Sequence, residues 1–238
     1  MDYSWRYYQY QTKARGLLSK KDLEHSFLKM ADLYRARVGK FLPMDKDALC
    51  LDLPCGYGNF LFFLRLEGYR NIFGCDQDVR QIQLAQLLNL PVKNADVFEV
   101  LSENIESVDL LSSIDFIEHL SKDSALEFLD QCYLSLKKSG VLIIRTPCAD
   151  GPFGAHDANN DLTHQWSMTS NVLRTILEMV GFSNVIILEE RPLPGGFINT
   201  CRWLVYFPAK AVANLFCVTL GMRPPRIWSR SMIAVAYK

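Results

Sequence analysis

The 238-residue sequence lacks several features that would place it in a specialised class of protein. It has no apolar run of the ~20 residues that a membrane-spanning helix needs, and its polar, aromatic first residues contain no signal-peptide core. Its seven cysteines are odd in number and form no C-x-x-C pair, which favours buried, reduced thiols in a cytoplasmic protein. With 49% hydrophobic residues, the composition excludes a disulfide-stapled miniprotein, a coiled coil and a disordered tail.

Net charge is also absent, because 26 Lys and Arg balance 26 Asp and Glu. The balance is uneven along the chain. Residues 71–135 hold twelve acids against three bases, a net charge of −9, whereas the segment after Glu190 holds seven bases and no acid. There is neither a continuous basic run nor a nucleic-acid motif, so we expect no nucleic-acid partner. The basic segment leaves an anionic ligand open.

Short apolar runs alternate with stretches of helical periodicity from residue 48 onward, behind one or two leading helices within 12–42. The expected strands are 48–53, 71–75, 92–93, 108–112, 140–145, 184–189 and 231–237. The expected helices between them are 58–67, 78–88, 99–104, 123–137 and 169–180. This alternation predicts an α/β fold with a Rossmann-like, mostly parallel seven-stranded sheet and helices on both faces.

A glycine-containing turn follows the first strand and carries the first chemical signal. The strand ending at Leu53 runs into the sequence PCGYGN and then into a helix, an arrangement that brings backbone close to a ligand. The second strand ends at Asp76, where a carboxylate can accept both hydroxyls of a ribose. A nicotinamide-dependent enzyme uses the same arrangement. However, Leu61 stands where the G-x-G-x-x-G fingerprint needs its third glycine, which counts against a dinucleotide.

Taken in order, these segments resemble the successive motifs of class I S-adenosylmethionine-dependent methyltransferases over about residues 48–190. The resemblance rests on LDLPCGYGNFL, the strand end GCD at Asp76, NADV at 94–97, and DLLSSIDFIEHL at 109–120. It implies S-adenosylmethionine as the cofactor. The segment from Ser231 resembles the closing strand of that fold, which is antiparallel and lies at the sheet edge. A single domain over 1–238 would comprise an N-terminal helical segment (1–46), a cofactor-binding core (48–190), an acceptor-side insertion or lid (191–230) and a final strand (231–238).

The resemblance implies where the methionine end of the cofactor would bind. Asp52 and the backbone around Cys55, Gly56 and Gly58 would hold it. Pro54 stands where the family often has its first glycine. Because proline has no N–H, this part of the loop could contact the cofactor only through carbonyls.

The nucleoside end would be held by residues that follow the second, third and fourth strands. Asp76 would accept the ribose hydroxyls and Gln77 would lie beside the adenine. Asp96 would accept from the adenine amino group, while Val97 would donate its backbone N–H to the ring. An alternative for Asp96 is that it caps the helix that follows.

The end of the fourth strand contributes the remaining wall of the expected pocket. Ile114 and Asp115 would line it by the same resemblance. Glu118 and His119 follow. We expect them to cap or brace the next helix, with participation in the acceptor site as the second possibility.

The loop after the fifth strand is polar and should emerge beside the cofactor. It holds two histidines and three acids between Asp150 and Trp166. The segment Asp161–Thr169 resembles bacterial methyltransferases that modify sugars and cell-surface polysaccharides, and the resemblance makes His164 the candidate general base, with Asp161 and His119 as further catalytic candidates. Two alternatives stay open: His164 caps a loop while Thr169 begins a helix, or His156, Asp157 and Asp161 ligate a divalent ion. We assign no metal.

The segment 191–230 interrupts the repeating pattern and contains a nearly all-apolar helix at 209–220. A helix buried under the sheet edge is the commonest outcome for such a pattern. An acceptor lid and a peripheral contact with the inner face of a membrane, suited to a lipid-linked substrate, are the other two.

Together these features predict a methyltransferase that transfers the methyl group of S-adenosylmethionine to an oxygen of a sugar or glycan intermediate, which could be anionic. Methylation of another small molecule, such as a quinone precursor or a natural product, stays open. So does a non-catalytic module that binds S-adenosylmethionine, since a fold does not guarantee chemistry. The sequence specifies no oligomeric state.

Overall fold

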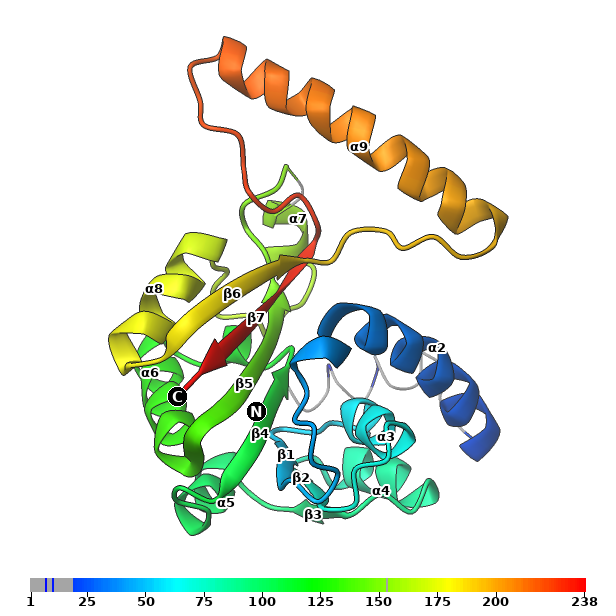
Figure 1. Ribbon diagram of the computed structural model, residues 1–238, viewed down its shortest axis with the longest axis vertical. Helices are drawn as coiled ribbons and strands as arrows, with labels where there is room; N and C mark the ends of the chain where they lie inside the picture. Colours follow the sequence, from blue (N-terminus) through cyan, green and yellow to red (C-terminus); the bar gives the residue numbers. More distant parts are fainter. Residues whose placement is uncertain (1–6, 8–9, 11–18, 153) are drawn as a thin grey trace.

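The computed structural model describes residues 7, 10, 19–152 and 154–238, except the side chains of 157 and 158. A seven-stranded sheet forms its centre (Figure 1), with the strand order β3-β2-β1-β4-β5-β7-β6. The strands are β1 (Cys50–Asp52), β2 (Ile72–Asp76), β3 (Val92–Asn94), β4 (Val108–Ile114), β5 (Leu136–Pro147), β6 (Ser183–Glu189) and β7 (Ser231–Tyr237). Every expected strand is therefore present, and the predicted Rossmann-like fold class is confirmed.

The strands from β1 to β5 are parallel, whereas β7 runs antiparallel to both of its neighbours. The resemblance placed the closing strand at the edge of the sheet, and this placement is wrong. β7 lies between β5 and β6, with Ile144 opposite Ala234 on one side and Ile187 opposite the same residue on the other. Because β7 is covered on both edges and both faces, its Met-Ile-Ala-Val-Ala run is buried, which explains why it shows no alternation of apolar and polar residues.

Helices cover both faces of the sheet (Figure 1). One face carries α5 (Val97–Glu103), α6 (Lys122–Ser135) and α8 (Ser170–Val180), and the other carries α2 (Lys20–Val38), α3 (Asn59–Leu66) and α4 (Val79–Leu87). Short 3₁₀ turns lie at η1 (Gly39–Phe41) and η2 (Ile117–His119), and α7 (Gly154–Ala158) is a single short helix in the loop after β5. The expected leading helix is present as α2, while residues 12–18 lie outside the described part of the chain.

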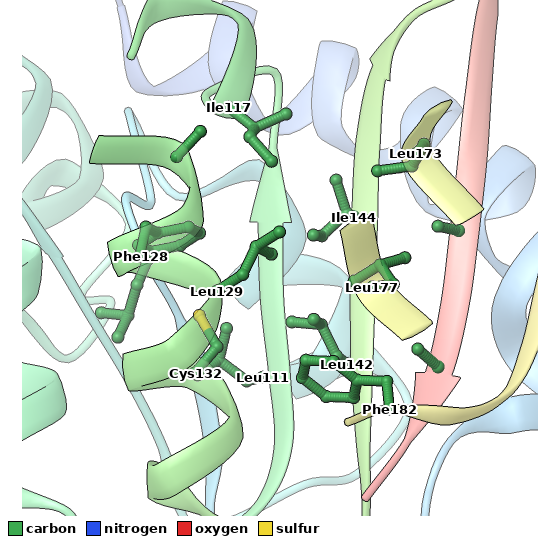
Figure 2. Close-up of a cluster of buried hydrophobic side chains, with 14 of the residues drawn as sticks. Leu111, Ile117, Phe128, Leu129, Cys132, Leu142, Ile144, Leu173, Leu177 and Phe182 are labelled. Carbon is green, nitrogen blue, oxygen red and sulfur yellow. The ribbon is translucent and has the colours of Figure 1, made fainter. Parts of the chain in front are cut away.

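Buried apolar side chains hold α6 and α8 against β4 and β5. Figure 2 shows Phe128, Leu129 and Cys132 of α6 facing the sheet beside Leu177 of α8. All four are fully buried. Burying a large apolar side chain stabilises the folded state by about 1.5–3 kcal/mol relative to leaving it exposed. This packing therefore fixes α6 and α8 on the sheet, and with them the positions of the loops at the carboxyl ends of β4 and β5.

The other face owes its packing to α3, whose residues 60–64 are all buried. A helix that is apolar all round needs cover on two sides, and α2 supplies the second. The ring of Phe27 lies 5.4 Å from that of Phe62, and the ring of Tyr34 lies 5.0 Å from that of Phe60, both edge-on. The leading helix is therefore an integral layer over the glycine-containing turn that precedes α3.

The apolar helix expected at 209–220 is part of α9 (Gly196–Thr219), and no residue of this fully described helix is buried. Of the three outcomes considered for it, burial under the sheet edge is excluded. Figure 1 shows α9 projecting away from the sheet, joined to it by the chain from β6 and the chain into β7. Among the residues described, no helix is both long and apolar enough to cross a bilayer.

Candidate active site

A cleft with a volume of about 1890 Å³ lies at the carboxyl ends of the parallel strands. Its walls come from the loops after β1, β2, β4 and β5, from α2, and from the segment that leads into and out of α9. This is where parallel α/β sheets bind ligands, because the strand ends meet there and their loops diverge. All of the cofactor candidates named from the sequence line the cleft except Gly58, which lies in the turn at its floor.

The glycine turn after β1 is held by hydrogen bonds to the neighbouring strand. The N–H of Cys55 donates to the carbonyl of Cys75 at 2.8 Å, and the N–H of Gly56 donates to Asp76 Oδ2 at 3.0 Å. Gly56 has φ +52° with open space where a Cβ would stand. Gly58 has φ +86°, and a Cβ there would lie 2.4 Å from Leu90. The first glycine therefore leaves room toward the cleft, while the second is required by packing.

A third glycine in this region was missed by the sequence reasoning because it lies on a strand. A Cβ added to Gly74 of β2 would lie 2.7 Å from both Cys55 and Leu61. The close approach of helix and sheet that the dinucleotide fingerprint obtains from a glycine on the helix is here obtained from a glycine on the strand. Leu61 is therefore compatible with tight packing of α3 on the sheet.

The carboxylates after β2 and β3 face the cleft as a connected group. Asp76 also accepts the N–H of Asp78, at 2.8 Å. Asp96 accepts the N–H of Phe98 at 2.7 Å and caps α5, so the capping alternative describes what the structure shows. Its second oxygen accepts a hydrogen bond from Gln77. The role of Asp96 toward an adenine stays a prediction, and it would require Gln77 to share that oxygen.

Asp52 is fully buried at the floor of the cleft, where the Ser112 hydroxyl donates to its Oδ1 at 2.6 Å. Burial raises the pKa of Asp52 to about 7, and the nearby Asp76 carboxylate adds to the rise while the Ser112 hydrogen bond opposes it. Loss of water disfavours the charged form of any buried carboxyl. A cationic group placed beside Asp52 would restore the charged form, which is the property expected of a residue that faces an amino group.

Replacing Asp52 with asparagine should make the stability of the protein less sensitive to pH. In the free protein the folded state retains a proton that the unfolded carboxyl loses near its ordinary pKa, so stability falls as pH rises from about 4 to 7. The slope approaches about 1.4 kcal/mol per pH unit, or roughly 3 °C in the melting temperature. In thermal melts without ligand, the melting temperature of the variant should rise relative to that of the wild type as the pH increases across this range. A constant difference between the two would contradict the raised pKa.

Glu118, His119 and His164 meet in the cleft, on the loops that follow β4 and β5. His164 Nε2 lies 3.9 Å from Glu118 Oε1, and the two imidazole rings cross edge-on with centroids 4.8 Å apart. Thr146 donates to Glu118 Oε2 at 2.9 Å, while within the described part of the chain Oε1 accepts no hydrogen bond. Burial, with help from the Asp115 carboxylate, raises the pKa of Glu118 to about 8. The environment of Glu118 therefore favours its neutral acid form.

The hydrogen bonds around His119 determine its tautomer. Thr163 Oγ1 donates to Asp161 Oδ1 at 2.5 Å and lies 2.9 Å from His119 Nδ1. When the hydroxyl hydrogen is used on Asp161, the matching tautomer carries its proton on Nδ1 and its lone pair on Nε2. Burial lowers the pKa of His119, with a further contribution from His164, which favours the neutral ring. Asp161 thus acts on His119 through Thr163.

These contacts correct one expectation and bear on two alternatives. The capping part of the expectation for Glu118 and His119 is wrong, because Ser121 caps α6 by accepting the N–H of Ser124. Thr169 caps α8, as one alternative expected. Among the described residues, the group whose atoms could surround an ion is Glu118, His119 and His164 rather than the one around His156, for which the side chain of residue 157 lies outside the described set.

An ion-pair network connects the cleft to α2. Arg145 of β5 pairs with Asp115 and, at 2.9 Å, with Glu190, and Arg37 of α2 pairs with the same Glu190 at 2.9 Å. Asp115 has φ +53°, a backbone conformation that L-residues other than Asn and Asp rarely adopt. The sequence reasoning missed Arg37 and Arg145, because neither belongs to a recognised motif. Both lie where α2 and β5 approach the end of β4. Ile114 lies beside Asp115 on the cleft wall, and Val97 lies on the opposite side, after Asp96.

Comparisons with known proteins identify the family of this fold. Residues 24–186 match the family described as "Methyltransferase domain", which is more than half of the chain. The chain belongs to this methyltransferase family. No curated protein sequence matches the methyltransferase at a significant level.

Solved structures include several similar methyltransferases. An S-adenosylmethionine-dependent methyltransferase from Archaeoglobus fulgidus is 26% identical, with a TM-score of 0.65 over 87% of this chain and 94% of that chain. A possible histamine N-methyltransferase from Thermotoga maritima is 16% identical, with a TM-score of 0.61 over 90% of each chain. Phosphoethanolamine N-methyltransferase 2 of Haemonchus contortus, solved with S-adenosylmethionine, is 14% identical, with a TM-score of 0.58 over 87% of this chain and 52% of that chain. The last two share the fold alone.

The expectation of an S-adenosylmethionine-dependent methyltransferase is confirmed at this level. The residues present also fit the cofactor. Gly56 leaves open space beside the turn, Asp52 offers a buried carboxyl, and Asp76 offers a carboxylate held by two backbone N–H groups. The residues that would hold each part of the cofactor stay predictions.

Proposed function

We propose that the protein methylates a hydroxyl group of a sugar or glycan intermediate, with His164 as the general base. The observation that carries the proposal is the cluster of His164, His119 and Glu118 in the cleft, on loops after β4 and β5, whereas Asp76 and Asp96 follow β2 and β3. An alcohol must lose its proton as it becomes methylated, and an imidazole in the cleft is suited to take it. Bound S-adenosylmethionine supplies an electrophilic methyl group whose bond to sulfur breaks as the new bond to oxygen forms.

Exposure to the cleft and the neighbouring side chains make His164 the member of the cluster best placed to take a proton. Its side chain is 10% exposed, whereas Glu118 is 1% exposed and faces it across 3.9 Å. When His164 takes a proton, its positive charge lies beside the carboxyl group of Glu118. Glu118 can then release its own proton and stabilise that charge. His119, fixed by Thr163 and Asp161, packs against the ring of His164 and orients it.

The acceptor end of the cleft supports a polar, ring-shaped acceptor. Tyr206 and Trp228 contribute aromatic rings, and Gln165 and Ser229 contribute groups that can make hydrogen bonds. The segment after Glu190, which contributes to this end, holds seven bases and no acid, and a guanidinium pairs well with a carboxylate or phosphate. An acidic sugar or a phosphate-linked glycan combines these features, so we infer that the acceptor is anionic.

The proposal is tested by measuring transfer of a trideuteromethyl group from labelled S-adenosylmethionine to a panel of acceptors. We expect nucleotide-linked or phosphate-linked uronic acids to gain one labelled methyl group as an ether that survives mild alkali. The neutral sugars of the same stereochemistry are the matched controls and should react more slowly.

Other products would contradict specific parts of the proposal. A labelled ester that alkali removes would place the methyl group on a carboxylate, and a labelled amine would replace O-methylation by N-methylation. Binding of S-adenosylhomocysteine with no transfer to any acceptor in the panel would favour a non-catalytic binding module.

A further inference from the structure

The outer face of α9 is a continuous apolar surface without cover. Phe197 is 86% exposed and Val212 is 70% exposed. The residues of this outer face recur at helical spacing along the whole helix: Phe197, Ile198, Leu204, Val205, Pro208, Val212, Leu215 and Phe216. Five of these residues, together with Ala209 and Ala213 beside them, also form a shallow apolar groove. Large apolar patches of this kind mark interaction surfaces.

The opposite face of α9 holds the helix in a fixed orientation. Tyr206 Oη donates to Glu189 Oε1 at 2.7 Å, and Lys210 Nζ donates to both oxygens of the same carboxylate at 2.9 Å. Tyr206 also lines the cleft. The polar face is therefore directed at the body of the protein, which leaves the apolar face pointing outward, as the separation of α9 from the sheet in Figure 1 indicates.

The surroundings of the outer face carry charge of one sign. No acid occurs after Glu190, whereas Arg191, Arg202, Arg223 and Arg226 are all exposed. Within the described part of the chain, none of these four arginines forms an ion pair; Arg191 instead lies over the ring of Phe207. An apolar face flanked by cations alone is complementary to a surface that is apolar inside and anionic at its boundary.

We propose that the outer face of α9 docks the protein on the surface of an anionic lipid bilayer. The helix would lie in the plane of the membrane, since it is too polar to cross one. Its apolar residues would enter the boundary between headgroups and acyl chains, while the flanking arginines would bind anionic headgroups. This proposal is independent of the acceptor and of the base named above.

A second copy of the chain fits this surface less well. Two outer faces packed together would bring two sets of arginines close, and the segment 191–230 has no acid to compensate them. Like charges placed opposite one another disfavour an interface. Pairing of α9 with the acidic region 71–135 of another copy would be head-to-tail and would generate open chains rather than a closed dimer.

Docking by this face would place the acceptor end of the cleft next to the membrane. Pro192, Tyr206, Trp228 and Arg230 line the cleft and belong to α9 or to the two segments that connect it to the sheet. An acceptor held in the membrane by a lipid chain would then reach the cleft without leaving the bilayer.

Co-sedimentation of the full chain with vesicles tests the proposal. We expect binding to vesicles of phosphatidylglycerol and phosphatidylcholine and much weaker binding to phosphatidylcholine alone. Val212→Glu should lower the partition coefficient by about ten-fold or more, because a buried apolar side chain is replaced by a charge facing anionic lipid. Neutralising Arg223 and Arg226 should lower it by about five-fold each.

Met179→Glu is the matched control, because Met179 of α8 is also 70% exposed and the substitution adds the same charge elsewhere. It should bind vesicles like the wild type. Equal loss in both variants, or equal binding to neutral and anionic vesicles, would overturn the proposal. So would a stable dimer in solution that Val212→Glu dissociates and that ignores vesicles. Binding of S-adenosylhomocysteine, measured on the same variants, should be unchanged, which separates this test from the proposed function.

Discussion

Replacing Asp76 with alanine is expected to weaken the binding of S-adenosylmethionine by about 10- to 150-fold, the range expected for a lost hydrogen bond to a charged group. Asp76 lies at the end of β2 and faces the cleft, with its oxygens already directed by the N–H groups of Gly56 and Asp78. Burial raises the pKa of this carboxyl, and the two backbone donors oppose the rise, so they favour a charged acceptor at neutral pH. A titration followed by calorimetry measures the dissociation constant directly.

The structure also shows a second consequence of this substitution. Alanine removes the acceptor of the Gly56 N–H, so the glycine turn loses one of its two ties to β2. Asp76→Asn keeps an oxygen for that N–H and should retain more of the affinity than alanine does. Asp130→Ala, on the exposed side of α6, is the control for removal of one acid. Unchanged affinity in Asp76→Ala would remove this residue from the cofactor site.

Replacing His164 with alanine is expected to lower kcat by about 10²-fold or more while leaving the affinity for S-adenosylmethionine unchanged, because general base catalysis typically contributes that much. His164 lies in the loop after β5, whereas Asp76 ends β2, and β1 and β4 separate these strands in the sheet, so the cofactor site predicted around Asp76 should not sense its loss. Turnover with the best acceptor of the panel, measured beside cofactor binding, separates the two effects. A thermal melt of the variant, measured alongside turnover, shows whether the fold persists without this side chain.

His25→Ala is the control for this experiment, because His25 is exposed on α2 and does not line the cleft. It should retain full turnover. An active His164→Ala enzyme would contradict the assignment of the base and would direct attention to His119, whose tautomer also presents a lone pair. If both the affinity for the cofactor and turnover fell in His164→Ala, the residue would have a structural role instead.

Local patterns were sufficient to predict most of the fold from the sequence. The run from Leu49 to Asp52 reads as a buried strand and the sequence PCGYGN as a turn because apolar runs and glycines act over a few neighbouring residues. The same holds for α8, which begins at the capping Thr169 and ends at Gly181 with φ +116°. The position of β7 was missed, since a strand's neighbours depend on pairing across the sheet rather than on its own residues.

One part of the candidate site could be predicted from the sequence and another part could not. The residues around Asp52, Asp76 and Asp96 follow three successive strands, and parallel strands deliver their carboxyl ends to one edge, so their convergence follows from the order of elements alone. The meeting of Glu118 with His164 does not. It joins residues 46 positions apart through a loop whose path is set by Thr146, Asp161 and Thr163.

The sequence by itself thus determined the sheet, the glycine turn, the family resemblance and the uneven distribution of charge, because each is written in residues that are close together in the chain. Only the tertiary structure determined where the apolar helix of the basic segment lies and which of its faces is exposed. Periodicity shows that α9 is a helix, but whether it is covered depends on which other surfaces remain available, and here Glu189 fixes its polar face inward while the described part of the chain provides no cover for the other. The same neutral sequence therefore places some of its acids, among them Asp76 and Asp96, in the cleft and four exposed arginines around an exposed apolar face.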